Sequence, residues 1–196
     1  MTMMRFARHG AVLAALVLLA GCLSLGGKAP KLLVGLTAEK TAPAGPIPSG
    51  PIGSALVVVD PAADRKLDVL RIPVQVDETQ IAYLKDVAWV ERPARMFRRL
   101  LTETIRAHGR FVVEDSDDAN AGHQMLAGRL IDLGYDARSM AAVVRFDATR
   151  ENGQGSVESR RFEASVPTGS AKPEAIAPAL NRAANQVAQQ VADWVG

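Results

Sequence analysis

The chain has 196 residues, of which 48% are hydrophobic and 22% are charged, and its formal net charge is +2. This length is sufficient for one domain with a hydrophobic core and short for two. A mean hydropathy near zero argues against a polytopic membrane protein. One cysteine and three histidines exclude an intramolecular disulfide and a cysteine-rich zinc or iron–sulfur site, so we expect no metal and no cofactor.

The N-terminus is predicted to be a bacterial lipoprotein signal. Arg5 and Arg8 form a short positive region, and residues 11–20 form an unbroken apolar stretch that is too short to span a bilayer. The sequence LAGC at its end resembles a lipobox, in which signal peptidase cleaves between Gly21 and Cys22 and the Cys22 thiol receives a diacylglycerol. The alternative is an ordinary secretory signal followed by an incidental cysteine.

Lipidation at Cys22 would hold the mature protein on a membrane without a membrane-spanning segment, because the acyl chains supply the anchor. We therefore expect a signal peptide at 1–21, a lipidated tether at 22–31 and one domain at 32–196. Leu23 stands where an aspartate would resemble an inner-membrane retention signal. Its identity favours the outer membrane, with the domain on the periplasmic side.

Cleavage of the signal also changes the charge balance. The removed segment contains Arg5 and Arg8 from the 23 basic residues and none of the 21 acidic ones, so the mature chain has 21 of each. A formal net charge of zero gives nucleic-acid binding no electrostatic support. We expect no nucleic acid among the partners.

The first part of the domain is predicted to consist of short strands. Residues 40–54 contain four prolines and three glycines, and we expect them to form a loop. In the next extended segment, Leu70 and Val76 are expected on the same face as the apolar residues between them, and Pro73 suggests an edge position or a bulge. The expected strands are 32–36, 55–59, 70–76 and 81–84.

Two amphipathic helices are predicted. The first begins at Pro93 and ends at Gly109. The second begins at Pro173 or Pro178 and closes the chain, with Asn185 on its polar side. Apolar residues recur at helical spacing in both. The first stripe is Phe97, Leu100, Leu101, Thr104 and Ile105; the second is Ile176, Leu180, Ala184, Val187, Val191 and Trp194.

Further strands lie between the two helices. Residues 111–113 form a short one, and 123–133 form a longer one whose alternation is imperfect. Residues 140–148, with Met140 on the inward side, and 157–166 alternate cleanly and are expected to pair as a hairpin. The predicted fold class is α+β, an antiparallel or mixed sheet with both helices packed on one face.

The sequence contains no convincing catalytic or metal site. His108 is expected to stabilise a helix C-terminus, and His123 has no nucleophile or metal-ligand spacing around it. The acidic run 114–118 lacks the spacing of an EF-hand and is expected to be a solvated turn. Trp89 and Trp194 are expected to be packing residues. We therefore expect a protein that is not an enzyme.

The polar face of the first helix carries candidate partner-binding residues. Arg95, Arg98 and Arg99 lie on this face and could contact anionic head groups or an acidic protein surface. The alternative is an ordinary solvated helix face, which is the more common meaning of such a run of charges.

Several segments together resemble the ABC-type transport auxiliary lipoprotein family, which includes paraquat-inducible lipoproteins associated with MCE-type lipid transport systems. The resemblance covers residues 32–195 and is most specific around Trp89. The segments are ALVVVDP (55–61), RIPV (71–74), IAYL (81–84) and VAWVERP (87–93), leading into FRRLL (97–101).

The resemblance implies an accessory role and no reaction of its own. The partners would be an MCE-domain protein and an ABC permease and ATPase, and the transported substrates would be phospholipids or other hydrophobic molecules. ATP hydrolysis by another subunit agrees with the lack of a phosphate-binding loop motif in this sequence. Two alternatives stay open: an outer-membrane lipoprotein that activates a cell-wall enzyme, and a lipid carrier with an apolar cavity between sheet and helices.

Overall fold

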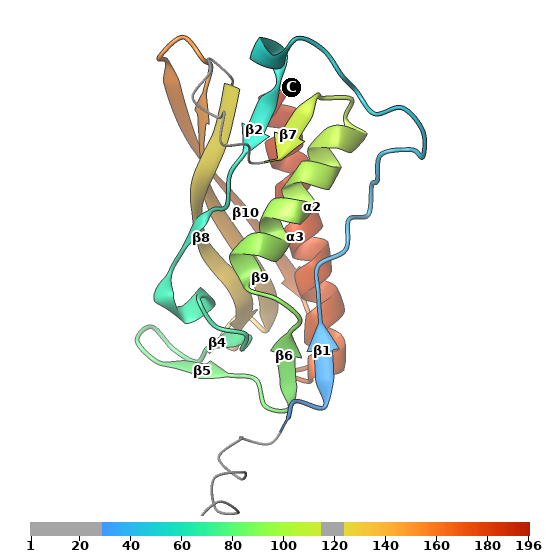
Figure 1. The fold of residues 1–196 in the computed structure, drawn as a ribbon. Helices are drawn as coiled ribbons and strands as arrows, with labels where there is room; N and C mark the ends of the chain where they lie inside the picture. Colours follow the sequence, from blue (N-terminus) through green and yellow to red (C-terminus); the bar gives the residue numbers. More distant parts are fainter. Residues whose placement is uncertain (1–28, 115–123) are drawn as a thin grey trace, which may run out of the picture. The chain divides into compact units, whose positions relative to one another are not determined.

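A computed structural model describes residues 29–114 and 124–196 (Figure 1). The predicted signal peptide, including Gly21 and Cys22, lies outside the described residues, as does His123. Leu32–Gly196 form one unit of the chain.

The centre of this unit is a mixed sheet with the strand order β10-β9-β8-β2-β7. Three long strands form an antiparallel succession: β8 (Gln124–Asp136), β9 (Ala141–Glu151) and β10 (Val157–Pro167). Two short strands, β2 (Leu56–Val58) and β7 (Val112–Glu114), continue the sheet in parallel. The predicted hairpin of the last two strands is confirmed, and its register pairs Phe162 with Phe146.

Shorter elements surround this sheet. The strands β3 (Ala62–Ala63) and β4 (Pro73–Gln75) pair with β8, and β5 (Ile81–Tyr83) pairs with β4. A separate two-stranded parallel sheet joins β1 (Leu32–Val34) to β6 (Val87–Trp89). Two single 3-10 turns are η2 (Ile52–Ser54) and η3 (Arg65–Leu67).

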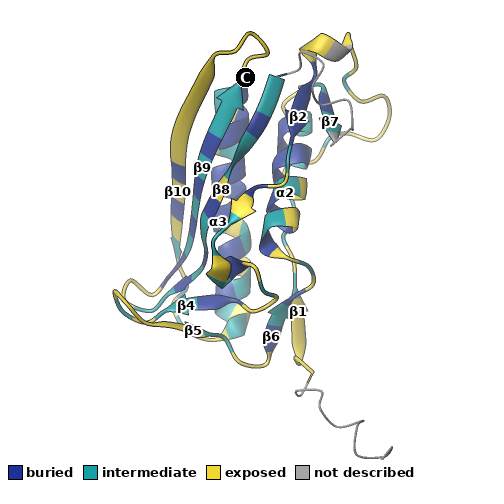
Figure 2. Ribbon diagram, turned by 60° about the vertical axis from the view of Figure 1, so that its left-hand side comes forward, coloured by how far each residue is buried: buried dark blue, intermediate teal, exposed yellow. Residues whose placement is uncertain are grey.

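Both predicted helices are present and lie together against the sheet (Figure 2). The first, α2 (Pro93–Ala107), buries Phe97, whose ring meets that of Phe146 edge-on at a centroid distance of 5.2 Å. The second, α3 (Pro173–Val195), begins at the earlier of the two prolines, and its Trp194 ring packs 5.6 Å from the Phe162 ring. The α+β fold with helices packed on a mixed sheet is confirmed.

A bulge in β8 explains why its apolar alternation is imperfect. The register with β9 shifts between Leu130 and Asp132, so Ile131 is an extra residue. The shift lets Leu130 and Leu133, three positions apart, both point into the core, where each is fully buried. For the same reason Arg129 and Asp132 both lie on the opposite, open face of the sheet.

The segment 70–76 differs from the prediction. Only residues 73–75 form a strand, and Leu70 and Val76 are exposed because they lie outside the ladder. Pro73 does not lie on an edge strand, since β4 runs between β5 and β8. It occupies the first position of the strand, which a proline tolerates. Gly134 on β8 permits the close approach of β4, because a Cβ at this position would lie 2.6 Å from the Pro73 carbonyl oxygen.

Two further side chains were assigned to the wrong environment. Met140 is exposed because it lies in the turn before β9 and has a positive φ of 52°. Asn185 is buried, although it lies among polar helix residues, because its side-chain amide bonds to the backbone of Thr37 and Glu39. Ala42 also donates to Glu103 on α2 at 2.8 Å, so the proline-rich segment lies against this helix.

Candidate functional site

The three arginines predicted to bind a partner lie on α2 beside two carboxylates. Arg98 is the least exposed, at 18%, and its Nε lies 2.7 Å from Oδ1 of Asp60, directly after β2. Arg99 lies 2.5 Å from Glu91 through Nη2, and Arg95 lies 3.6 Å from the same carboxylate through Nη1.

The three guanidinium groups differ in how far they are exposed to solvent. Arg95 and Arg99 remain more than half exposed, while Arg98 is held against Asp60. The arrangement separates two roles: Arg98 joins α2 to the end of β2, and the other two arginines present their guanidinium groups to solvent. Partner binding by this face stays a prediction.

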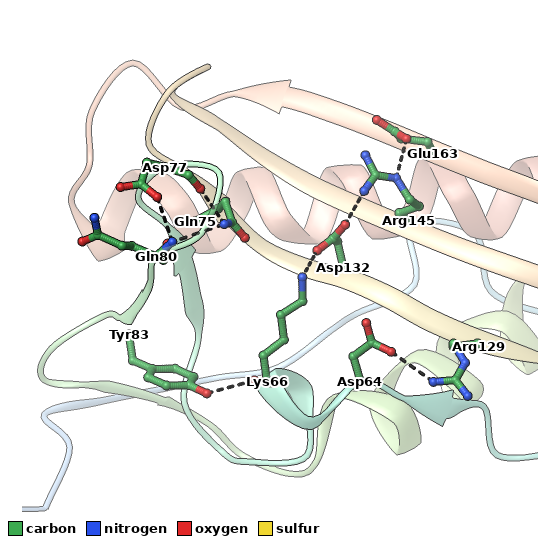
Figure 3. Close-up of polar contacts among 10 residues, drawn as sticks. All are labelled: Asp64, Lys66, Gln75, Asp77, Gln80, Tyr83, Arg129, Asp132, Arg145 and Glu163. Atoms are coloured by element: carbon green, nitrogen blue, oxygen red, sulfur yellow. Dashed lines mark hydrogen bonds and ion pairs between the residues drawn. The ribbon is translucent and has the colours of Figure 1, made fainter.

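The open face of the sheet carries a row of alternating charges that runs across three strands (Figure 3). Arg145 on β9 donates from Nη1 to Asp132 on β8 at 2.5 Å and from Nε to Glu163 on β10 at 2.7 Å. Lys66 in η3 extends the row by an ion pair with Asp132. The hydrogen bond that Arg145 donates to Glu163 is the main cause of the raised pKa of Arg145.

A second row with the opposite sign order lies next to the first. Asp64 accepts from Arg129 at 3.1 Å, and Arg129 is in register with Asp147. Asp147 in turn accepts two hydrogen bonds from Arg161, at 2.5 and 2.6 Å. These bonds, followed by the charge of Arg161, hold the pKa of the Asp147 carboxyl below its usual value, outweighing desolvation. The bulge at Ile131 places Asp132 of the first row on the same face of the sheet as Arg129 of the second.

A hollow of about 430 Å³ opens between the first charge row and the β4–β5 turn. Its lining residues carry both signs of charge and include Lys66, Asp77, Glu78, Asp132, Arg138 and Arg145. Asp77 accepts from the backbone N–H groups of Thr79 and Gln80, each at 2.8 Å, and these bonds lower its pKa. Asp132 is paired within the charge row. We therefore interpret this hollow as a polar surface whose charges are paired with neighbouring groups, and not as a catalytic pocket.

The other candidates have structural surroundings. His108 lies at the end of α2, with Nδ1 2.7 Å from the Thr104 carbonyl oxygen and Nε2 in contact with Gln189. Trp89 is buried in the core and Trp194 packs on the sheet, as expected. Residues 115–118 of the acidic run lie outside the described residues. In the described part of the chain, no three histidine, cysteine or carboxylate side chains gather into a metal-binding group.

Within the described residues, no helix is long and apolar enough to cross a bilayer.

The two charge rows were not foreseen from the sequence. Their signal lay in the hairpin register, which pairs Arg145 with Glu163 and Asp147 with Arg161 once the turn is placed. The β8 members could not be found in this way, because the bulge moves them.

Comparison with known proteins identifies a family. A family model described as ABC-type transport auxiliary lipoprotein component matches residues 36–192. The crystal structure of a Xanthomonas campestris protein assigned to the DUF330 family is similar, with 22% identity, a TM-score of 0.69, and coverage of 83% of this chain and 94% of that chain. No curated protein matches the chain significantly.

Two further solved structures are similar at lower identity. One, described as an uncharacterized protein, has 14% identity and a TM-score of 0.69, and covers 85% of this chain and 99% of that chain. A leucine-to-methionine variant of the PelC dodecamer from Paraburkholderia phytofirmans has 17% identity and a TM-score of 0.45, and covers 75% of this chain and 92% of that chain. At 14% identity, the first of these two structures shows a shared fold and nothing about partners.

Proposed function

Because the chain belongs to the family of ABC-type transport auxiliary lipoprotein components, we propose that it is a non-catalytic accessory subunit of an MCE-type transport system. Its system would move phospholipids or other hydrophobic substrates across the cell envelope. The family match over residues 36–192 carries this proposal. The ATPase and permease of the complex would supply the energy and the membrane path.

Anchoring is the first part of the proposed mechanism. Cleavage after Gly21 and acylation of Cys22 would attach the domain to the periplasmic side of the outer membrane. Fully extended, residues 22–31 reach at most about 33 Å. Because this tether is short, an MCE partner must provide the remaining distance to the inner-membrane permease.

Docking is the second part. The exposed guanidinium groups of Arg95 and Arg99 on α2 suit an acidic surface of the MCE-domain partner, and Arg98 holds the helix against Asp60. An edge of the main sheet is the other candidate surface, since among residues 29–114 and 124–196 the strand β10 pairs with β9 alone. Unpaired strand edges can bind an added strand.

The packing of the domain favours a connecting role over a carrier role. Side chains between the sheet and the helices are almost fully buried, including Phe97, Phe146, Leu130 and Val187. The hollow of about 430 Å³ lies on the open sheet face and is lined by charges, which suits no acyl chain. These observations support a subunit that connects others.

The docking proposal is tested by quantitative co-purification from cells that contain the full transport system. Arg95→Glu/Arg99→Glu should lower recovery of the MCE-domain protein, because two attractive charges become repulsive. Arg182→Glu is the matched control, since Arg182 is an exposed arginine on the other helix. Equal recovery of the MCE-domain protein with both variants would exclude the α2 face. A Cys22→Ser variant that kept full recovery and full transport would exclude a role for the anchor.

A further inference from the structure

Exposed apolar side chains gather at one end of the unit Leu32–Gly196. Nine large hydrophobic residues are exposed among the described residues. Six of them lie on β1 and β4–β6 or on the segments next to these strands, and Met140 lies in the β8–β9 turn. Figure 1 shows these strands together at the end where the chain enters the unit. We call these seven residues the apolar end: Leu32, Leu33, Leu70, Val76, Ile81, Val90 and Met140.

Backbone hydrogen bonds connect the segments that carry these residues. Trp89 N–H donates to Leu70 O at 2.8 Å, which places Leu70 beside β6. Val76 N–H donates to Gln80 O at 2.9 Å across the β4–β5 turn. Ala137 N–H donates to Gln75 O at 2.9 Å, so the turn that contains Met140 lies against β4. The segments that carry the apolar end are therefore hydrogen-bonded to one another in one part of the fold.

The outward face of the β1–β6 pair is the most unusual part of it. In a strand pair that covers a core, alternate residues should be apolar inside and polar outside. Trp89 points inward and is buried, but the outward positions carry Leu33, which is 58% exposed, and Val90, which is 53% exposed. Gly35 lies opposite Val90, close enough that a Cβ there would sit 3.4 Å from Val90 Cγ2. This face lacks the polar side chains that water would favour.

The connection to the anchor indicates what covers this surface. The chain enters the unit at Leu32, within the apolar end, and residues 22–31 reach at most about 33 Å from Cys22. β8, with 13 residues, extends over about 43 Å. A tether shorter than the domain limits how far the end to which it is attached can lie from the bilayer, and leaves the opposite end free to lie farther away. The exposed Arg71 and Lys85 lie on the same segments and can meet lipid phosphates.

We propose that the apolar end rests on the lipid bilayer that holds the anchor, with Leu33 and Val90 inserted among the head groups. This inference rests on the proposed acylation of Cys22. The acyl chains supply attachment, and the apolar end supplies orientation, since contact at several points prevents the domain from turning about its tether. The end of the sheet that carries Val157 then points away from the membrane.

The test uses the acylated full chain, purified from membranes and reconstituted in phosphatidylethanolamine–phosphatidylglycerol vesicles. A single cysteine is introduced as Leu33→Cys, Val90→Cys or Val157→Cys and carries a nitroxide spin label, because the acylated Cys22 thiol does not react. Val157 is the matched control, a valine that is 60% exposed at the start of β10. Collision rates with oxygen and with a nickel chelate report the depth of each label in lipid, and mass spectrometry of the N-terminal peptide reports acylation.

We expect the ratio of oxygen to nickel collisions to rise several-fold at positions 33 and 90 on transfer from detergent to vesicles, and to stay unchanged at 157. Acylated protein with aqueous labels at both positions would overturn the inference and leave the anchoring intact. Labels shielded from both reagents would mean that protein covers the surface, which also overturns it. An unmodified Cys22 would refute the anchoring and the inference together.

Discussion

Asn185 allows the sharpest prediction about stability, because one side chain joins the N-terminal segment of the domain to its last helix. Its Oδ1 accepts from Glu39 N–H at 2.8 Å, and its Nδ2 donates to Thr37 O at 2.9 Å and to Asn181 O at 2.8 Å. The neighbouring Asn181 makes one bond of the same kind, accepting from Thr37 N–H at 2.8 Å. The segment between β1 and the proline-rich loop is thus fixed on α3.

The magnitude follows from counting these bonds. Asn185→Ala removes three hydrogen bonds, each contributing about 1 kcal/mol net to stability. Alanine regains roughly 0.6 kcal/mol through its better helix propensity. We expect the free energy of unfolding to fall by about 2 kcal/mol. Asn181→Ala removes one of the bonds that hold the segment and regains the same propensity, so its cost should be under about 0.5 kcal/mol.

Urea denaturation followed by circular dichroism measures both variants on the same chain. Asn185→Asp refines the test, because its carboxylate keeps the acceptor for Glu39 N–H but faces the carbonyl oxygens of Thr37 and Asn181 without a donor. Burial against these oxygens should raise its pKa, so the variant should lose stability as pH rises. If Asn185→Ala costs no more than Asn181→Ala, the proposed fixing of the segment by Asn185 is wrong.

Gly128→Ala should destabilise the protein by roughly 2–3 kcal/mol, because its Cβ would lie 2.3 Å from Asp147 O and 2.6 Å from the Phe146 ring; Gly53→Ala, which meets no atom within 4 Å, is the control and should leave the urea midpoint unchanged. Asp147→Asn should flatten the acid side of the plot of stability against pH. Because the pKa of Asp147 is lowered in the folded state, its ionised carboxylate stabilises the fold at pH values above the unfolded-state pKa of about 3.9. This contribution is lost as pH falls through the folded-state pKa. Urea midpoints at neutral and acidic pH check this, and an unchanged difference between the two would contradict it. Phe97→Ala should lower the free energy of unfolding by about 3–5 kcal/mol in the same assay, since the ring is fully buried against Phe146. A loss below about 1 kcal/mol, which is the net contribution of one hydrogen bond, would refute this packing.

Local signals in the sequence predicted the elements that local chemistry controls. Pro93 and Gly109 bracket α2, and Gly109 has the positive φ of 85° that suits a residue after a helix. The strand β6 was missed because Val87–Trp89 is short and its partner in the ladder is β1, more than fifty residues earlier. No local pattern reports such a pairing.

The features of the open face and of α3 depended on contacts that no local pattern contains. The alternation rule fails at Ile131, because one extra residue moves every later side chain of β8 to the other face. Asn185 is polar and helical, and only the return of the Thr37–Glu39 segment buries it. Arg95 and Arg99 were located correctly on the polar face of α2, but their sharing of Glu91 was not foreseen.

The central proposal is an accessory role in an MCE-type transport complex, and crosslinking in intact cells tests it most directly. The anchored protein would be crosslinked, captured and examined by mass spectrometry for both proteins and lipids. The proposal predicts recovery of an MCE-domain protein together with an ABC permease and ATPase. Recovery of a cell-wall synthase without any of these subunits would contradict it.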